Sequence, residues 1–153
     1  MKPIKRHEAL KPLSRVHHQG LLLSWKIRTG LKKGISIERI KNYCDFFFKE
    51  ELIHHFNIEE LRIFTLLESD DELIKKALVD HRKLKKLFLQ KLPEMKTIVA
   101  IEKELEKHIR FEERILFNKI QEEASKKQLL RIQELQSFST SYDIDSWNDK
   151  FWE

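Results

Sequence analysis

The scarcity of helix-breaking residues constrains the fold of this chain more than any other feature. Its 153 residues include only 3 Gly and 3 Pro, and 36% of them are charged. This composition favours long helices over a β architecture, which needs many turns. The length suits one domain with a single sizeable core. We therefore expect an all-α protein.

Start signals for helices recur along the chain. Lys11-Pro12 can open a first helix, because proline is tolerated where the backbone amide has no helical acceptor. Ser36 is suited to cap a second helix. The segments 69–72 and 125–128 resemble capping boxes, in which a serine and a Glu or Gln three residues later satisfy each other's amides. Pro93 suits the opening turn of a fourth helix.

These signals predict four long helices and a short fifth one. Gly30 and Gly34 are suited to close the first helix. We expect the long helices at residues 12–30, 36–68, 69–92 and 93–123, and the fifth after Ser125. The short connections favour an up-down-up-down four-helix bundle. We expect this bundle and its fifth helix to occupy residues 1–138.

The final segment, residues 139–153, loses helical periodicity and is expected to be a C-terminal tail. It carries aromatic residues between Tyr142 and Trp152. These side chains could pack on the bundle, mediate self-association or stay mobile, and the sequence leaves the three alternatives open.

Charge and hydropathy argue against several classes of partner. The net charge of +5 arises from basic and acidic residues mixed along the chain, so nucleic-acid binding is not indicated. No apolar run approaches the roughly 18 to 20 residues that span a bilayer, and the polar start lacks a signal-peptide core. We expect no membrane partner and a cytoplasmic location. The lone Cys44 fits a reducing compartment and the role of a buried structural thiol.

Four histidines, one in each expected long helix, carry the chemical information. An advance of about 100° per residue places His17, His55, His81 and His108 on the apolar faces, with Glu59 and Glu112 one turn after His55 and His108. His17 falls at the edge of its face, and His18 falls nearly opposite. His54 and Glu60 are expected to point away from the core.

Six inward polar groups demand compensation. A single histidine on an apolar face is usually an ordinary core residue, and a His-Glu pair four residues apart is commonly a surface hydrogen bond. Here, however, each uncompensated buried polar group would cost roughly 1 to 3 kcal/mol. The sum would rival the whole stability of a domain, about 5 to 15 kcal/mol. A pair of metal cations would neutralise these groups directly.

The segments around these residues resemble the hemerythrin-like, or HHE cation-binding, domains. The resemblance rests on the order and spacing of four segments and covers about residues 10–122. The matching segments are Leu13–His18, His54–Glu60, Asp80–Leu84 and His108–Glu113.

The resemblance implies two non-haem iron ions, as Fe2+ or Fe3+ with an oxo or hydroxo bridge, inside the bundle. Glu59 and Glu112 would be bridging carboxylates; His17 and His55 would hold one iron, and His81 and His108 the other. A small ligand such as dioxygen, nitric oxide or peroxide would bind at the metal pair. Oxygen-carrying members have a further histidine where this chain has Lys85, so the resemblance is closer to the iron- and oxygen-sensing members.

The leading hypothesis is a non-haem di-iron binding protein that senses or handles oxygen, redox state or iron. One alternative is a di-iron enzyme that consumes peroxide or another oxidant. Another is a metal-free helical protein-interaction module whose tail binds a partner. Ferritin-like iron storage is disfavoured, because that pattern places Glu-x-x-His on paired helices whereas this chain has His-x-x-x-Glu. The sequence identifies neither a protein partner nor the oligomeric state.

Overall fold

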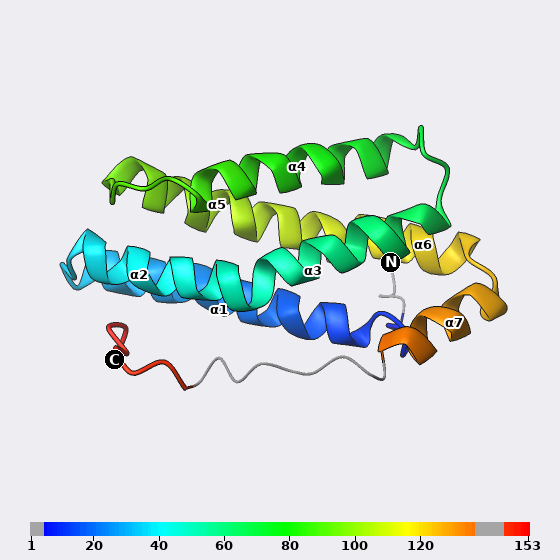
Figure 1. Ribbon diagram of the computed structural model, residues 1–153, viewed down its shortest axis with the longest axis horizontal. Coiled ribbons are helices and arrows are strands. Elements are labelled where there is room, and N and C mark those ends of the chain that lie inside the picture. Colours follow the sequence, from blue (N-terminus) through cyan, green and yellow to red (C-terminus); the bar gives the residue numbers. More distant parts are fainter. Residues whose placement is uncertain (1–4, 137–145) are drawn as a thin grey trace.

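The computed structural model describes residues 5–136 and 146–153, and every regular element within them is a helix (Figure 1). Four long helical rods, each made of one or more consecutive helical elements, form the bundle, and a shorter helix comes after them. The elements are α1 (Lys11–Lys32); α2 (Ile37–Phe47), η1 (Phe48–Leu52), α3 (Ile53–Ile58), η2 (Glu59–Ile63) and η3 (Phe64–Leu66); α4 (Glu72–Phe88); α5 (Met95–Phe111), η4 (Glu112–Leu116) and α6 (Phe117–Glu123); and α7 (Lys126–Gln136). The rods are numbered in chain order: α1, α2 to η3, α4, and α5 to α6.

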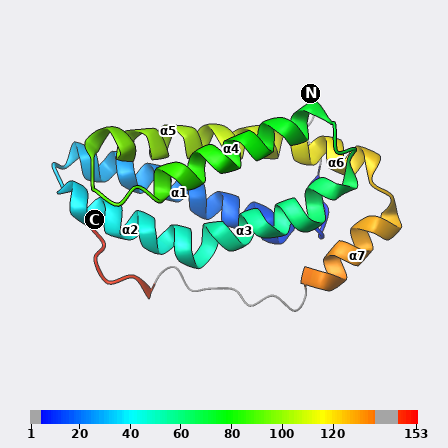
Figure 2. The same ribbon diagram turned by 45° about the horizontal axis from the view of Figure 1, so that its top comes forward.

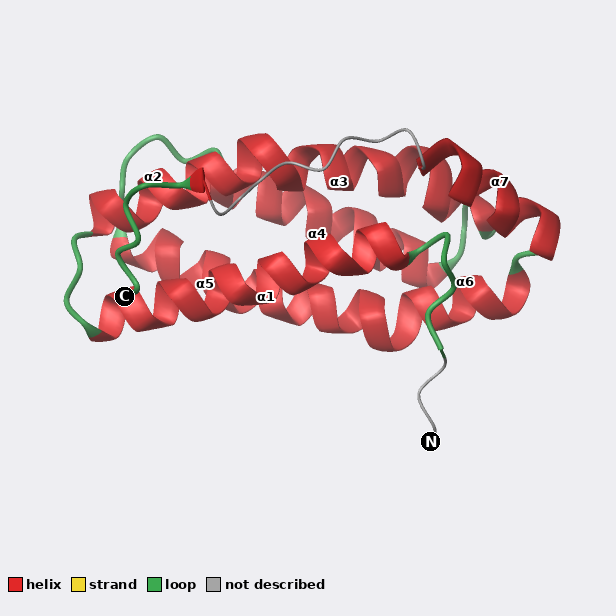
Figure 3. Cartoon of the chain, turned by 90° about the horizontal axis from the view of Figure 1, so that it is seen from below, coloured by secondary structure: helices red, strands yellow, loops and turns green. Residues whose placement is uncertain are grey.

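Consecutive rods run in opposite directions, which confirms the predicted up-down-up-down bundle (Figures 1 and 2). Helix α1 packs against α5 and α2, and α4 packs against α5. Helix α7 lies at one end of the bundle, and the chain ends at the opposite end beside α2 (Figure 3). Short connections between rods leave each helix next to its sequence neighbour, as expected for antiparallel packing.

The first connection uses the predicted capping residues at Gly34 and Ser36. Gly34 has a φ of 73°, and its N–H donates to the Leu31 carbonyl while the Ile35 N–H donates to the Gly30 carbonyl. This is a Schellman motif, which favours glycine at the left-handed position. Ser36 then accepts from the Arg39 amide at the start of α2. Gly30, by contrast, lies inside α1 and does not end it.

The start of α4 differs from the prediction. Asp71, rather than Ser69, is the N-cap, and its side chain accepts a hydrogen bond from the Leu73 amide at 2.8 Å. Asp71 lies directly before the helix, where a short carboxylate reaches the free amides of the first turn. The capping box at Ser125 is confirmed. The Gln128 backbone amide donates a hydrogen bond to Ser125 Oγ at 3.1 Å, and the Ser125 backbone amide donates one to Gln128 Oε1 at 2.9 Å.

The connection between α4 and α5 is longer than predicted. Helix α4 ends at Phe88, and α5 begins at Met95 after the N-cap Glu94. Leu92 is therefore in the connection and is 71% exposed. Pro93 precedes the N-cap Glu94, whose backbone is extended (φ −128°, ψ 138°), so the proline does not open α5.

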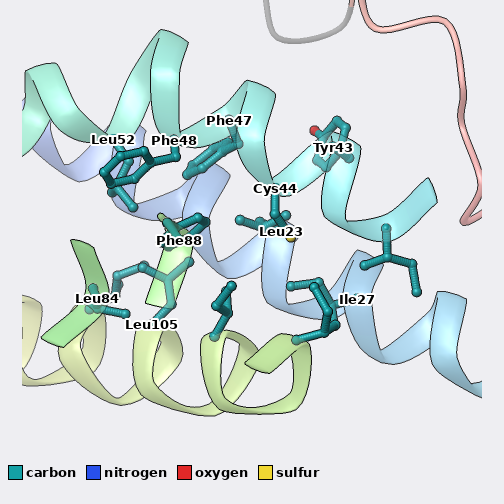
Figure 4. Close-up of a cluster of buried hydrophobic side chains, with 14 of the residues drawn as sticks. Leu23, Ile27, Tyr43, Cys44, Phe47, Phe48, Leu52, Leu84, Phe88 and Leu105 are labelled. Atoms are coloured by element: carbon teal, nitrogen blue, oxygen red, sulfur yellow. The ribbon is translucent and has the colours of Figure 1, made fainter. Parts of the chain in front are cut away.

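Two separate apolar clusters form the core. The first, called here the Tyr43 cluster, joins α1, α2 and the facing parts of α4 and α5, and Figure 4 shows part of it. The second, called here the Phe117 cluster, fills the other end with residues such as Leu13, Ile63 and Phe117. Cys44 belongs to the Tyr43 cluster, as expected of a structural thiol, and burial raises the pKa of its thiol.

Three π-helical segments, η1, η2 and η4, interrupt the second and fourth rods. In η2 the Phe64 N–H donates to the Glu59 carbonyl, and in η4 the Phe117 N–H donates to the Glu112 carbonyl, five residues earlier in each case. Such turns hold one more residue than an α-helical turn and occur frequently at functional sites. Two of the three segments begin at the glutamates that the sequence analysis selected.

The described part of the expected tail packs back on the bundle. Phe151 is 2% exposed, and Trp147 and Trp152 pack against the same Tyr43 cluster. Tyr142 lies outside the described residues. Among the helices of residues 5–136 and 146–153, none combines the length and apolar character that crossing a membrane requires.

Candidate metal centre

The six predicted residues converge in the layer between the two apolar clusters. Their exposures are 3% for His17, 2% for His55 and His108, 1% for His81, and 0% for both Glu59 and Glu112. His18 and His54 are exposed. Helical periodicity therefore predicted the correct face for all six, including the choice between His17 and His18.

These residues form two groups that share both carboxylates. One group contains His17, His55, Glu59 and Glu112, and the other contains Glu59, His81, His108 and Glu112. Within each group, one donor atom from every residue lies within 4.8 Å of the others. Each group could therefore hold one metal ion, with the glutamates positioned between the two.

Each glutamate reaches histidines of both groups. Glu59 Oε1 is 3.0 Å from His55 Nε2 and 3.3 Å from His81 Nε2. Glu112 Oε1 is 2.9 Å from His17 Nε2 and 3.1 Å from His108 Nε2. The four Nε2 atoms thus face the same pair of carboxylates from four sides. This is the arrangement in which facing helices of a bundle supply ligands to a common interior site.

Three further carboxylates, which were not predicted as site residues, are hydrogen-bonded to the Nδ1 atoms of three of the histidines. Glu113 accepts from His17 Nδ1 at 2.7 Å, Glu60 is 2.8 Å from His81 Nδ1, and Asp80 is 3.0 Å from His108 Nδ1. The expectation that Glu60 points away was wrong: its long side chain leaves the edge of its helix and reaches sideways to α4. A carboxylate on Nδ1 leaves Nε2 free to ligate a metal.

Basic residues pair with these three outer carboxylates. Glu113 Oε1 lies 3.7 Å from Arg6, Asp80 lies 2.9 Å from Lys76, and Glu60 lies 3.7 Å from Lys85. Glu113 also accepts from Ser14 at 2.9 Å. Lys85 occupies the position one turn after His81, and its ammonium, having no lone pair, cannot ligate a metal.

Most of the unsatisfied buried polar atoms belong to this layer. Among the described residues, eight buried side-chain N and O atoms have no hydrogen-bond partner, and seven of them are in the site. They include both ring nitrogens of His55, both oxygens of Glu59, and the Nε2 atoms of His81 and His108. Buried polar groups are normally satisfied, so a concentration of exceptions at one place suits a bound cation.

Charge and burial act in opposite directions on these groups. Burial alone would lower the pKa of His17, but hydrogen bonds to Glu112 and Glu113 outweigh it and raise the pKa to about 9. Burial likewise opposes the attraction of Glu112 and Asp80 at His108, whose pKa rises to about 10. For His55, burial prevails and lowers the pKa. In the absence of metal, these raised pKa values favour protons on His17 and His108 that balance the buried carboxylates.

The fold and the site together define a class of protein: a helical bundle with histidines and carboxylates in its interior that could hold cations. The sequence profile of the hemerythrin HHE cation binding domain matches residues 7–120, and the chain belongs to this family. The matched range contains all six residues of the site. Comparison with curated proteins gave no significant match, and comparison with solved structures gave none either.

Proposed function

We propose that this chain is a non-haem di-iron binding protein that responds to oxygen, redox state or iron supply. The single observation that carries the proposal is the pair of buried four-residue groups that share Glu59 and Glu112. In this assignment, His17 and His55 would hold one iron, His81 and His108 would hold the other, and Glu59 and Glu112 would be shared by both. The family match, which is to a cation-binding domain, supports the same assignment.

The donor types favour iron. Mixed imidazole and carboxylate ligation that leaves positions open is typical of non-haem iron, whereas structural zinc sites are closed and often contain thiolates. The one cysteine, Cys44, packs in the Tyr43 cluster and is not among the site's donors. When bound, such an iron pair supplies redox chemistry towards dioxygen, nitric oxide or peroxide.

The protein's own residues would position and seal the pair. The carboxylates of Glu113, Glu60 and Asp80 fix the ring orientations of three histidines through Nδ1. Apolar clusters on both sides shield the layer from bulk solvent, and its six residues are 3% exposed or less. A site without water strengthens each electrostatic interaction inside it.

Lys85 argues against reversible oxygen carriage. A histidine at this position would add a donor to the His81 side of the pair, but the lysine instead pairs with Glu60 at 3.7 Å. The centre therefore offers four histidines and two carboxylates, with fewer imidazoles than an oxygen carrier has. Sensing, or handling of iron and oxidants, suits this donor set better.

A metal-free interaction module is the competing hypothesis, and the buried atoms argue against it. Without metal, the layer would bury two carboxylates and four histidines, and their desolvation would cost free energy that the ion pairs among them repay only in part. A bundle with no use for metal would be more stable with apolar residues there. The described aromatic residues of the proposed interaction tail, Trp147, Phe151 and Trp152, are moreover packed on the bundle itself.

Elemental analysis of gently purified protein, joined to absorption spectra before and after exposure to air, tests the proposal. We expect about two iron ions per chain and a visible charge-transfer band that appears on oxidation. Steady-state addition of peroxide to the iron-loaded protein then separates a sensor from an enzyme, because only an enzyme turns over repeatedly. Protein that cannot be loaded with metal would exclude the proposed function.

A further inference from the structure

The centre is built from two similar halves. In the first, α1 supplies His17, and the second rod supplies His55, Glu59 and Glu60. In the second half, α4 supplies His81, and the fourth rod supplies His108, Glu112 and Glu113. Each half thus contains one helix that supplies one histidine to the site and one helix that supplies the pattern His-x-x-x-Glu-Glu.

Two of the outer carboxylates respect this twofold pattern. Glu60 of the first half holds His81 of the second, at 2.8 Å from Nδ1. Glu113 of the second half holds His17 of the first, at 2.7 Å from Nδ1. His17 of α1 and His81 of α4 are therefore oriented in the same way, each by the second glutamate of the opposite half.

The third outer carboxylate breaks the pattern. Asp80, the residue before His81, lies 3.0 Å from Nδ1 of His108 within the same half. The corresponding residue before His17 is Val16, which cannot accept a hydrogen bond. Nδ1 of His55 is accordingly buried with no hydrogen-bond partner among the described residues.

We propose that the two metal positions are unequal: the His81–His108 position binds its ion more tightly, and the His17–His55 position fills last and empties first. This inference rests on the proposed function, because it concerns the same two ions. Its basis is the number of ligating histidines whose Nδ1 is hydrogen-bonded to a carboxylate. In the tight position both His81 and His108 have such a bond, whereas in the labile position only His17 does.

The physical reason lies in the effect of a carboxylate on Nδ1. It fixes the tautomer that presents a lone pair on Nε2, it prevents the ring from rotating, and it makes the imidazole a stronger donor. Loss of such a partner typically costs 10- to 100-fold in metal affinity. His55 must instead present Nε2 from a ring oriented by packing alone, beside His17 at a centroid distance of 4.7 Å.

Unequal positions would give the protein a graded response to iron. Over a range of about 10- to 100-fold in free iron, the tight position would be occupied and the labile one empty. Because Glu59 and Glu112 belong to both groups, filling the labile position would change the charge around the ion already bound. The one-ion and two-ion forms would then be distinct states of the same site.

Release of iron to an excess of chelator, under anaerobic conditions, tests this directly. Fe2+-loaded wild type should lose its ions in two phases, with one ion in each. Asp80→Asn should accelerate the slow phase by about tenfold and leave the fast phase unchanged. Glu113→Gln should accelerate the fast phase alone, because its carboxylate holds His17. If Asp80 and Glu113 only stabilised the fold, the two variants would not each accelerate a different phase of iron release.

Asp45→Asn is the matched control for Asp80→Asn. Each aspartate pairs with a lysine four residues earlier, at 2.9 Å in both cases, but Asp45 belongs to neither group of the site. The control should release iron as the wild type does. Melting curves of the metal-free variants confirm that each one is folded.

Val16→Asp tests whether an added carboxylate strengthens the labile position, since residue 16 precedes His17 as Asp80 precedes His81. We expect it to slow the fast phase by about tenfold and bring the two rates together. Two ions that leave the wild type in a single phase would overturn the inequality and leave the proposed function intact. A wild type that binds no iron would overturn the proposed function itself. Acceleration of the fast phase by Asp80→Asn would reverse the assignment of positions.

Discussion

At the scale of single residues, the centre shows how a buried histidine can gain or lose a proton according to its neighbours. His17 and His108 each lie between an inner and an outer carboxylate, and their pKa values rise to about 9 and about 10. His55 has no outer carboxylate, and burial lowers its pKa. Glu112 has the largest raising effect on the pKa of His17 and His108, and the outer carboxylates Glu113 and Asp80 add to it.

These pKa values predict a pH dependence of metal-free stability. A histidine whose folded pKa exceeds the unfolded value of about 6.5 stabilises the fold fully below that value, and the stabilisation is lost as pH rises through the folded pKa. Urea denaturation in the presence of chelator should therefore give a free energy of unfolding that falls between about pH 7 and pH 9.5, by an amount on the order of a few kcal/mol.

The metal-loaded protein is the control for this measurement. Ligating histidines carry no proton on Nε2, so their loss of charge is already complete when the ions are bound. Its stability should vary much less over the same interval. A metal-free protein of constant stability over that interval would contradict the assignment of protonated His17 and His108.

Glu112→Gln tests the bridging role at the same scale. The substitution keeps the size of the side chain but removes a negative charge that faces His17 and His108 at 2.9 and 3.1 Å. We expect the variant to retain at most one ion per chain by elemental analysis. Glu104→Gln, which removes a surface carboxylate paired with Lys83, should retain both ions. Two ions in Glu112→Gln would exclude this residue as a bridge.

The six inner residues could be predicted from sequence because helical periodicity reports which face of a helix is buried. It does not report how far an edge residue reaches. Glu60 and Glu113 are attached at the edge of the buried face, and only the distance to the adjacent helix decides whether they meet a histidine. Asp80 was missed for the same reason, since its partner His108 is on another rod.

At the scale of elements, the π segments change the direction of the side chains that follow them in the second and fourth rods. Each π turn takes in one additional residue, which rotates the subsequent side chains by about 100° relative to an uninterrupted α-helix. The sequence pattern predicts uniform helices and not these segments, because tertiary packing rather than local propensity selects them. Helix ends were predictable only where a local cap decides them, as at Gly34 and Ser36.

Gly30 and Phe151 form a contact between α1 and the C-terminal segment that can be tested by a double-mutant cycle. A Cβ atom at Gly30 would lie 2.7 Å from Phe151 Cε1, so Gly30→Ala should displace the ring and cost about 1 to 3 kcal/mol. In a Phe151→Ala background the same change should cost much less, because alanine favours helix over glycine by roughly 0.5 to 1 kcal/mol.

The measurement is the free energy of unfolding of the four proteins, with a coupling energy of at least about 1 kcal/mol expected. Gly34→Ala is a useful comparison, since no atom lies within 4 Å of its would-be Cβ and its cost comes from the positive φ alone. That cost should be independent of Phe151. Equal effects of Gly30→Ala with and without Phe151 would show that the aromatic ring does not occupy this position.

At the scale of the whole molecule, the ions should contribute to the stability of the fold. Ions that bind the assembled site but not the unfolded chain shift the folding equilibrium by mass action. A strong chelator should lower the melting temperature by about 3 to 10 °C, which corresponds to roughly 1 to 3 kcal/mol in a domain of this size. Glu112→Gln should respond less. An unchanged melting curve after verified metal removal would favour a site that binds no ion.

The polar layer between the Tyr43 and Phe117 clusters also bears on the cooperativity of unfolding. Residues of every long rod contribute to both clusters, yet the side chains that join the two clusters across the middle are charged or ionisable. The bound ions would act there as crosslinks among four helices. Their removal would weaken the coupling between the end of the core that holds Phe151 and the end that holds α7, so the melting transition of the metal-free protein should be broader than that of the loaded protein.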